Sequence, residues 1–383
     1  MGVPLRILGV TGTRADWGYM EPPLALLQSD PDFDVKLAVT GQHLVKDGEA
    51  SLAAIKADGF SIDARVDMLL ADDSRANVTR SLGLAILGFA DVLERIKPDL
   101  LIVLGDRYEM LAAAEAALIA RVPVAHLAGG DVSEGAFDDP IRHSITKMSH
   151  LHFVTNEESA RRVRQLGEDE TRIYNIGSTG LDRIRRIKPV PRDEFFGAIA
   201  MTARSSNFLV TFHPVTLEDD SEQQCTELLA ALDRFGPDTG LIFTGVNADP
   251  SGRLLEVMIR DFVSRHPNAV AVSSLGSQLY FSALSYVNMV VGNSSSGLYE
   301  APSFGIPTVN IGARQAGRLR PASVIDCAPE RDAILIAINR AQGLDCSNLE
   351  NPYGDGHASE RILPVLKHLR NPVELLKKRF FVQ

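Results

Sequence analysis

The amino-acid sequence predicts an α/β protein built from two doubly wound Rossmann-like domains that face one cleft. Short apolar runs alternate with longer amphipathic segments along most of the 383 residues. This alternation is typical of parallel sheets that are covered by helices on both faces. The apolar runs mostly end in glycine and polar residues, and the alternation stops near residue 183 and restarts near residue 207. Two such domains would place the carboxyl ends of their strands, where α/β proteins bind ligands, across one cleft.

The first domain is expected to cover residues 1–182. Apolar runs predict its strands at residues 5–10, 33–39, 100–104, 122–127 and 151–155. Helices are predicted to follow the first strand to about residue 28 and to cover residues 75–97, 108–120 and 157–166. A further helix is predicted to start at Asp139, its expected N-cap, with Pro140 in the first turn.

Residues 183–206 are expected to link the domains, because they hold Pro189, Pro191 and a cluster of basic side chains. The second domain is expected to cover residues 207–366, and residues 367–383 to form a C-terminal helix that packs back on the first domain. The predicted strands of the second domain are residues 208–212, 241–244, 269–272, 286–291 and 308–311. One helix is predicted at about residues 221–235. Two more are predicted to end near residues 266 and 304, and two others to begin after Pro329 and after Gly356.

Composition excludes several classes of protein. The net charge of −10 and the pI of about 5.4 argue against binding to nucleic acid or to an anionic membrane surface. Three widely spaced cysteines fit a reducing cytoplasm rather than a disulfide framework or a zinc site. The first residues predict a strand instead of a signal peptide, and no apolar run approaches the roughly 18 residues of a membrane span.

A polar segment from residue 126 to residue 152 lies between two predicted strands and is rich in acids and histidines. Its Gly129-Gly130 pair allows a tight turn. Asp106 ends the preceding strand, and we expect it to join Glu134, Asp138 and Asp139 in an acid cluster. Neighbouring carboxylates raise one another's pKa, which suits general acid–base chemistry. A magnesium site made by the same acids and a purely capping role for Asp139 are the alternatives.

A second group of residues is suited to phosphate. The serine loop, residues 292–297, connects a predicted strand to a predicted helix, so its backbone N–H groups and hydroxyls could bind phosphate; an ordinary N-cap is the alternative. Arginines just past three predicted strands could form a diphosphate clamp, although each could instead be a surface ion pair. His213 could contact phosphate or move a proton, and Glu300 could accept ribose hydroxyls. The phosphate candidates are Arg14, Arg107, Arg314, Ser294, Ser295 and Ser296.

Other motifs indicate no cofactor. The glycines after the first strand do not have the spacing of a dinucleotide fingerprint, and no acid ends the second strand. His126, His150 and His152 are interpreted as structural, because no third ligand stands at metal spacing. These motifs therefore predict neither a nicotinamide cofactor nor a metal ion held by the histidines, and the magnesium alternative is the weaker one because arginines could neutralise a diphosphate.

With these residues placed, the chain resembles the hydrolysing UDP-N-acetylglucosamine 2-epimerases of sialic and legionaminic acid precursor synthesis. The likeness covers nearly the whole chain, and its most specific string is the DD-x-IRH-x-IT-K sequence that starts at Asp138. Further matching segments are residues 11–17, 105–107, 129–131, 213–214, 292–295, 314–315 and 353–356. The resemblance implies a GT-B fold and a reaction without metal or nicotinamide. In that reaction a base removes the C2 proton while UDP leaves C1; water then adds to C1, and C2 is reprotonated on the opposite face.

The resemblance also implies roles for residues. Asp106 and Asp138 belong to the acid–base set, and Glu134 is a candidate from the residues themselves. His213 assists near the phosphate, and Glu300 binds the ribose. The expected diphosphate ligands are Arg14, Arg107, Ser294, Ser295 and Arg314, and the expected uridine neighbours are Asn247, Leu275, Gly276 and Ser277.

One departure from the family concerns Ala128. Several relatives place a glutamate, and others a histidine, before the Gly-Gly pair, and alanine cannot move a proton. Glu134, Asp131 or another group would then do this work, or the preferred sugar differs. Gly18 also stands where some relatives place a serine that touches UDP.

Two alternative functions are a non-hydrolysing UDP-N-acetylglucosamine 2-epimerase and a catalytically weakened UDP-sugar-binding protein. A GT-B glycosyltransferase is disfavoured by the DD-x-IRH string. The expected partners are a UDP-2-acetamido sugar and UDP, in a cytoplasmic homodimer or homotetramer. The sequence leaves the substituents at C4 and C6 of the sugar open.

Overall fold

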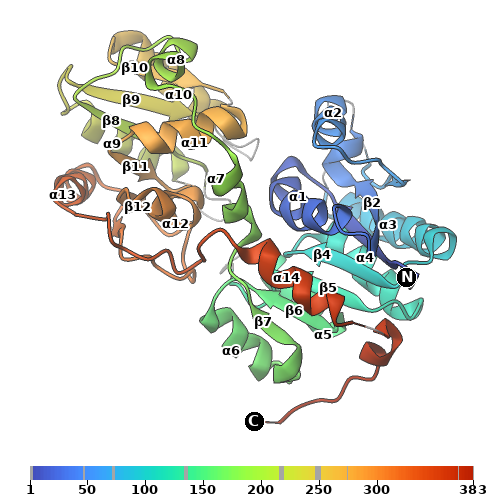
Figure 1. Cartoon of the computed structure of the whole chain (residues 1–383). Helices are drawn as coiled ribbons and strands as arrows, with labels where there is room; N and C mark the ends of the chain where they lie inside the picture. The colour runs from blue at the N-terminus through green and yellow to red at the C-terminus, as the bar shows by residue number, and fades with distance from the viewer. Residues whose placement is uncertain are drawn as a thin grey trace. The chain divides into compact units, whose positions relative to one another are not determined.

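The computed structural model describes residues 3–45, 48–70, 74–132, 137–214, 220–245, 252–273, 275–369 and 371–382, which form two compact units (Figure 1). The first unit contains Met1–Arg183 and Tyr353–Gln383, and the second contains Ile184–Pro352. The chain enters the second unit close to the predicted boundary. It returns to the first unit at Tyr353, earlier than the predicted residue 367.

The first unit is built on a sheet of seven parallel strands in the order β3-β2-β1-β4-β5-β6-β7. The direction of winding reverses between β1 and β4, the point at which doubly wound sheets bind ligands. The sequence did not predict β3 or β7, which have only three residues each and include exposed positions. The strands are β1 (Leu5–Thr11), β2 (Phe33–Thr40), β3 (Ala64–Val66), β4 (Leu100–Leu104), β5 (Val124–Leu127), β6 (Leu151–Val154) and β7 (Ile173–Asn175).

Helices cover both faces of this sheet. Successive side chains of a strand point to opposite faces, so Leu8 belongs to one buried core and Ile7 to the other. Helices α3, α4 and α5 cover the face of Leu8, and α1 and α14 cover the face of Ile7. The helices of this unit include α1 (Arg14–Gln28), α2 (Glu49–Ala57), α3 (Arg75–Ile96), α4 (Tyr108–Ile119), α5 (Asp138–Met148), α6 (Glu157–Gln165), α7 (Asp182–Arg186, which crosses the unit boundary) and α14 (Ala358–Lys367).

Helix α14 belongs to the first unit, whereas the sequence placed residues up to 366 in the second domain. The carboxylate of Asp182 accepts hydrogen bonds from the backbone N–H groups of Ala358 and Ser359, at 2.9 and 2.7 Å. Ile362 and Leu366 are buried against the core of the first unit. An apolar stripe predicts a helix but does not show which core it covers, so the pattern alone could not assign α14.

The second unit contains six parallel strands in the order β10-β9-β8-β11-β12-β13. The predicted strands are all present, and β13 was missed. The strands are β8 (Ser206–Thr211), β9 (Thr239–Thr244), β10 (Ala269–Val272), β11 (Met289–Gly292), β12 (Thr308–Ile311) and β13 (Val324–Cys327). The helices are α8 (Arg192–Ala198), α9 (Ser221–Leu232), α10 (Gly252–Arg265), α11 (Gly276–Tyr286), α12 (Ser296–Tyr299) and α13 (Arg331–Gln342).

The predicted link, residues 183–206, largely packs on the second unit. Its helix α8 buries Phe195 and Phe196 in the core that also contains Phe281. The backbone N–H of Val190 donates to Ser282 Oγ at 3.0 Å. The prolines and basic residues suggested a solvated linker, but two adjacent phenylalanines supply enough apolar area to anchor the segment.

Helix α3 is the one helix in the described part of the chain that is long and apolar enough to cross a bilayer by length and composition. Its buried residues, among them Phe89, Val92 and Leu93, pack against the sheet of the first unit. The opposite face exposes Leu84 and Leu87. The packing identifies α3 as an amphipathic cover helix with a partly apolar outer face.

Candidate active site

In the first unit, the loops that follow β1, β4 and β5 carry the predicted acid–base and arginine residues. These three strands are neighbours in the sheet, so their loops lie at one edge. Asp106 and Arg107 follow β4, and Ala128 begins the loop after β5. Arg14 is the first residue of α1 and is exposed. Glu134 lies outside the described residues.

Arg142 connects the loops after β4 and β5 to helix α5. Its side chain is almost completely buried and forms an ion pair with Asp106. The Nη1 atom donates to the backbone oxygen of Asp131 at 2.7 Å. The sequence placed Arg142 in the motif but gave it no role, because its partner Asp106 lies 36 residues earlier. The structure thus identifies a buried cation that holds one of the predicted catalytic carboxylates.

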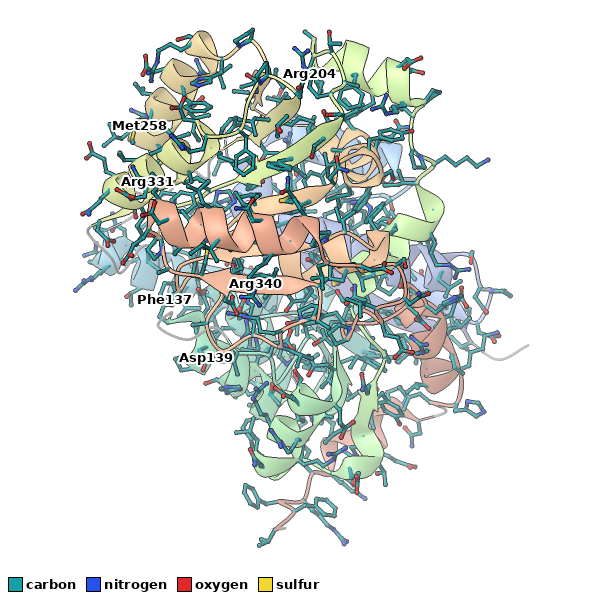
Figure 2. The ribbon with its side chains drawn as sticks, turned by 90° about the vertical axis from the view of Figure 1, so that its left-hand side faces the viewer. Phe137, Asp139, Arg204, Met258, Arg331 and Arg340 are labelled. Atoms are coloured by element: carbon teal, nitrogen blue, oxygen red, sulfur yellow. The ribbon has the colours of Figure 1, made fainter. Side chains whose placement is uncertain are left out.

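The expected N-cap role of Asp139 is wrong. Helix α5 starts at Asp138, and its N-cap residue Phe137 makes no capping hydrogen bond with its side chain. Figure 2 labels Phe137 and Asp139 at this end of the helix. Because Asp139 lies inside the first turn, its carboxylate approaches Arg142 at 3.7 Å and His143 at 3.4 Å, which stand three and four residues later.

Glu109 fixes the orientation of Arg107. The carboxylate is completely buried in α4 and accepts two hydrogen bonds, from Nε of Arg107 at 3.2 Å and from Nη2 at 3.1 Å. Burial alone would lower the pKa of Arg107, but the charge of Glu109 raises it above its ordinary value. Sequence reasoning missed Glu109. The available signal was one of only two acids, Glu109 and Glu115, in an otherwise apolar and alanine-rich helix.

Asp138 and Asp16 share the surroundings of Arg107. Burial raises the pKa of Asp138; Arg107 opposes this shift and Glu109 adds to it. Burial also raises the pKa of Asp16 to about 6, with the same two neighbours acting in the same directions. Asp16 accepts a hydrogen bond from the Gly12 N–H at 3.2 Å. The first unit therefore brings Arg107 and Asp138 together and holds two carboxyl groups whose pKa is raised by burial.

His126 supports the loop that carries Asp106. Its Nε2 atom donates to the backbone oxygen of Gly105 at 2.7 Å, and its Nδ1 atom lies 3.1 Å from Thr146 Oγ1 of α5. Complete burial lowers the pKa of His126 to about 3, so the ring is neutral at physiological pH. This arrangement agrees with the structural interpretation of His126.

Ala128 occupies a left-handed conformation with φ of +59°, which is uncommon for a residue with a side chain. Asp131, one of the groups considered as its replacement, accepts hydrogen bonds from Thr155 Oγ1 and Ser159 Oγ, both at 2.6 Å. These hydroxyls hold the Asp131 carboxylate near the start of α6. Its position favours a role in shaping the loop over proton transfer.

In the second unit, the loops after β8, β11 and β12 carry the predicted phosphate ligands. These strands are also neighbours. His213 follows β8 and is buried; burial and the nearby charge of Arg314 lower its pKa to about 4. Ser294, Ser295 and Ser296 are half-buried after β11. Arg314, after β12, donates from Nη1 to the backbone oxygen of Asn293 at 3.2 Å.

The helix predicted to run to residue 304 is interrupted. Helix α12 has only four residues, and the 3-10 helix η4 (Ala301–Phe304) follows it with Pro302 in its first turn. Proline lacks the N–H that a continuous helix would use. Glu300 lies half-buried at this break. The hydroxyl of Ser296 is hydrogen-bonded to Tyr280 of α11.

The predicted uridine neighbours differ in exposure. The Leu275 side chain is buried in the core, whereas Gly276 and Ser277 are exposed at the amino end of α11. A direct side-chain contact in this segment would therefore involve Ser277 rather than Leu275. Asn247 lies outside the described residues. Among the described residues no group of three or more histidine, cysteine or acidic side chains is arranged to hold a metal ion.

Comparisons with known proteins agree with this fold. A family described as UDP-N-acetylglucosamine 2-epimerase matches residues 25–367. The chain is 38% identical to a GDP/UDP-N,N'-diacetylbacillosamine 2-epimerase (hydrolyzing) from Campylobacter jejuni, over 84% of each protein. It is 37% identical to a UDP-N,N'-diacetylbacillosamine 2-epimerase (hydrolyzing) from Legionella pneumophila, over 97% of this chain and 98% of the relative. A crystal structure of UDP-GlcNAc 2-epimerase from Neisseria meningitidis bound to UDP-GlcNAc superposes with a TM-score of 0.81 at 21% identity, covering 95% of this chain and all of that chain (100%).

Proposed function

We propose, from the premise that this chain belongs to the UDP-N-acetylglucosamine 2-epimerase family, that its substrate is a UDP-linked 2,4-diacetamido sugar. The chain is a hydrolysing 2-epimerase with the GT-B fold. The reaction removes UDP from C1 and inverts C2, so the products are a free 2-acetamido sugar and UDP. Two relatives named for diacetylbacillosamine, each more than a third identical, support this choice of sugar over UDP-N-acetylglucosamine.

The observation that carries the mechanism is the contrast between two carboxyl groups of the first unit. Asp106 is paired with the buried guanidinium of Arg142, which stabilises its ionised form. Asp138 has a raised pKa because it is buried, with Glu109 adding to the shift. An ion-paired carboxylate and a carboxyl group with a raised pKa are suited to opposite roles in acid–base catalysis. We assign proton abstraction to Asp106 and proton donation to Asp138.

The balanced reaction has two steps. In the first, a base takes the proton from C2, a C1–C2 double bond forms, and the bond between C1 and the diphosphate oxygen breaks with its electron pair going to UDP. In the second, the oxygen of water bonds to C1, and a proton is delivered to C2 on the opposite face. The water loses one proton to the protein and keeps the other in the new C1 hydroxyl group, so the two proton-transfer groups return to their starting states. The protein must therefore supply an acceptor and a donor of protons and must stabilise the leaving diphosphate.

We assign UDP binding to the second unit. His213, Ser294, Ser295 and Arg314 follow adjacent strands, and the hydroxyls and guanidinium offer donors for phosphate oxygens. Glu300 is assigned to the ribose, and Ser296, Gly276 and Ser277 remain proposed nucleotide contacts. Arg14 and Arg107 of the first unit remain proposed diphosphate ligands. The bonds of Arg107 to Glu109 use Nε and Nη2 and do not use Nη1.

A homodimer or homotetramer is proposed from the outer face of α3 and α4. Leu87 of α3 is 68% exposed, and Ile119 of α4 is 84% exposed. Ile119 lines a groove of about 930 Å³ between these helices, together with Ile86, the neighbour of Leu87 in the chain. Contiguous exposed apolar side chains of this kind are typical of protein interfaces. A second copy of the chain is the proposed occupant.

We also propose a cytoplasmic location and a place in the synthesis of sialic acid-like sugars.

Proton NMR in heavy water tests the function directly. The purified protein is incubated separately with UDP-N,N'-diacetylbacillosamine and with UDP-N-acetylglucosamine. We expect UDP and a free manno-configured sugar with deuterium at C2, formed faster from the diacetamido substrate. Preference for UDP-N-acetylglucosamine would contradict the proposed sugar. Tight UDP binding without turnover of either sugar would instead support a catalytically weakened binding protein. In such a protein, Ala128 would stand in place of a residue that transfers a proton.

A further inference from the structure

Asn293 is completely buried at the first position after β11, next to the serine loop. Its side chain lies against the backbone of His213, at the end of the neighbouring strand β8. The N–H of His213 donates to Oδ1 of Asn293 at 2.7 Å, and Nδ2 of Asn293 donates to the His213 oxygen at 2.8 Å. A carboxamide offers one acceptor and donors side by side, so it satisfies both backbone groups of one residue.

The backbone of Asn293 makes further connections. Its oxygen accepts hydrogen bonds from Gln315 Nε2 at 2.8 Å and from Arg314 Nη1 at 3.2 Å. Its N–H donates to the oxygen of Thr211 at 3.0 Å. A single buried residue therefore joins the ends of β8, β11 and β12, which carry the histidine, the serines and the arginine.

The preceding glycine shows how closely these segments approach. Gly292 has φ of +136°, a conformation that favours glycine, and a Cβ atom there would lie 1.9 Å from the oxygen of Thr211. A side chain at position 292 would therefore clash with the backbone of Thr211. Asn293 is the first residue of the serine loop that has a side chain.

We propose that Asn293 is a positioning residue for the diphosphate of UDP. It holds His213, the serine loop and Arg314 in one arrangement before the nucleotide binds, so binding does not have to order three separate loops. Such preorganisation improves affinity because the ordering cost is met during folding. This inference rests on the proposed assignment of UDP binding to the second unit.

The chain contains a matched control for a merely structural role. Asn207 is also buried and lies in β8. Its Oδ1 accepts from the N–H of Arg204 at 3.1 Å, and its Nδ2 donates to the Arg204 oxygen at 3.0 Å. Figure 2 labels Arg204. The two asparagines thus make the same pair of bonds to a backbone, but the residue bonded by Asn207 precedes β8, whereas the residue bonded by Asn293 follows it.

The test compares Asn293→Ala with Asn207→Ala in the full-length protein, by thermal unfolding and by calorimetric titration with UDP. Both variants lose the two side-chain hydrogen bonds of a buried asparagine, so both should melt at a lower temperature than the wild type. We expect the dissociation constant for UDP to rise at least about tenfold in Asn293→Ala and less than about twofold in Asn207→Ala. The KM for the UDP-sugar should follow the same order.

A double-mutant cycle with Arg314→Ala adds a second readout. If Asn293 acts through Arg314, removing Arg314 should weaken UDP binding less in Asn293→Ala than in the wild type. Asn293→Ser, which can retain one of the two bonds, replaces Asn293→Ala if the latter does not fold. Equal UDP affinity in the Asn293 and Asn207 variants would overturn the inference while leaving the proposed function intact. A wild-type protein that binds no UDP would overturn both.

Discussion

The guanidinium of Arg142 and the carboxylate of Asp106 form an ion pair in which the arginine is almost completely buried. This pair fixes the loop after β4 to helix α5. Arg142 also bonds the loop after β5 through the Asp131 oxygen. One arginine therefore orders the loops on which the proposed proton transfer depends.

Arg142→Gln should lower kcat by at least about tenfold, because Asp106 loses the charge that stabilises its ionised form. UDP affinity should change little, since the proposed nucleotide contacts of the second unit are untouched. Steady-state kinetics and calorimetry measure both effects. Arg361→Gln is the control: Arg361 also bonds a carboxylate, Asp355, and a backbone oxygen, that of Ile176, in the same unit. Equal losses of kcat in the two variants would indicate a general effect on stability.

Asp106→Asn should abolish turnover and leave UDP binding nearly intact. The amide keeps the shape of the carboxylate but cannot accept a proton from C2 at neutral pH. Exchange of deuterium into C2, followed by NMR, measures proton abstraction directly. Unchanged exchange would remove Asp106 from the mechanism.

Glu109→Gln should weaken catalysis through Arg107. A glutamine keeps the volume but can no longer accept two charge-assisted hydrogen bonds from the guanidinium. We expect kcat/KM to fall by about tenfold or more, with a loss of stability of about 1–3 kcal/mol from the disturbed buried pair. Wild-type kinetics in this variant would show that the orientation of Arg107 does not matter to the reaction.

The sequence predicted most of the fold because each long strand is an apolar run with a polar end. The serine loop and the loops after β4 and β5 could be placed for the same reason. The sequence could not predict the ion pair of Arg142 and Asp106. These residues are 36 positions apart, and only the order of the strands in the sheet brings them together. The sequence did not single out Glu109, because an acid in the first turn of a helix is usually solvated. Helix α14 was assigned to the wrong unit because its apolar stripe fits either core.

Asp16→Asn should make the protein more stable at pH 8 than the wild type, and less so at pH 5. Burial raises the pKa of Asp16 to about 6 from an ordinary 3.8. Between these values the folded state holds more protons than the unfolded state, so this group's contribution to stability falls as pH rises. The loss is on the order of 1–2 kcal/mol above pH 6, because the group is only partly buried. Melting curves at both pH values measure the difference, and an equal shift at pH 5 and pH 8 would contradict it.

Leu87→Glu combined with Ile119→Glu should convert the proposed oligomer to monomers. Both side chains are exposed on the outer face of α3 and α4, so charges there disturb a protein partner but not the core. Ile336→Glu on α13 is the control, because Ile336 is 62% exposed and lies in the other unit. Sedimentation velocity should show a smaller species for the double variant alone, with a melting temperature that now depends less on protein concentration. The same species for all three proteins would show that this face of α3 and α4 is not where two copies meet.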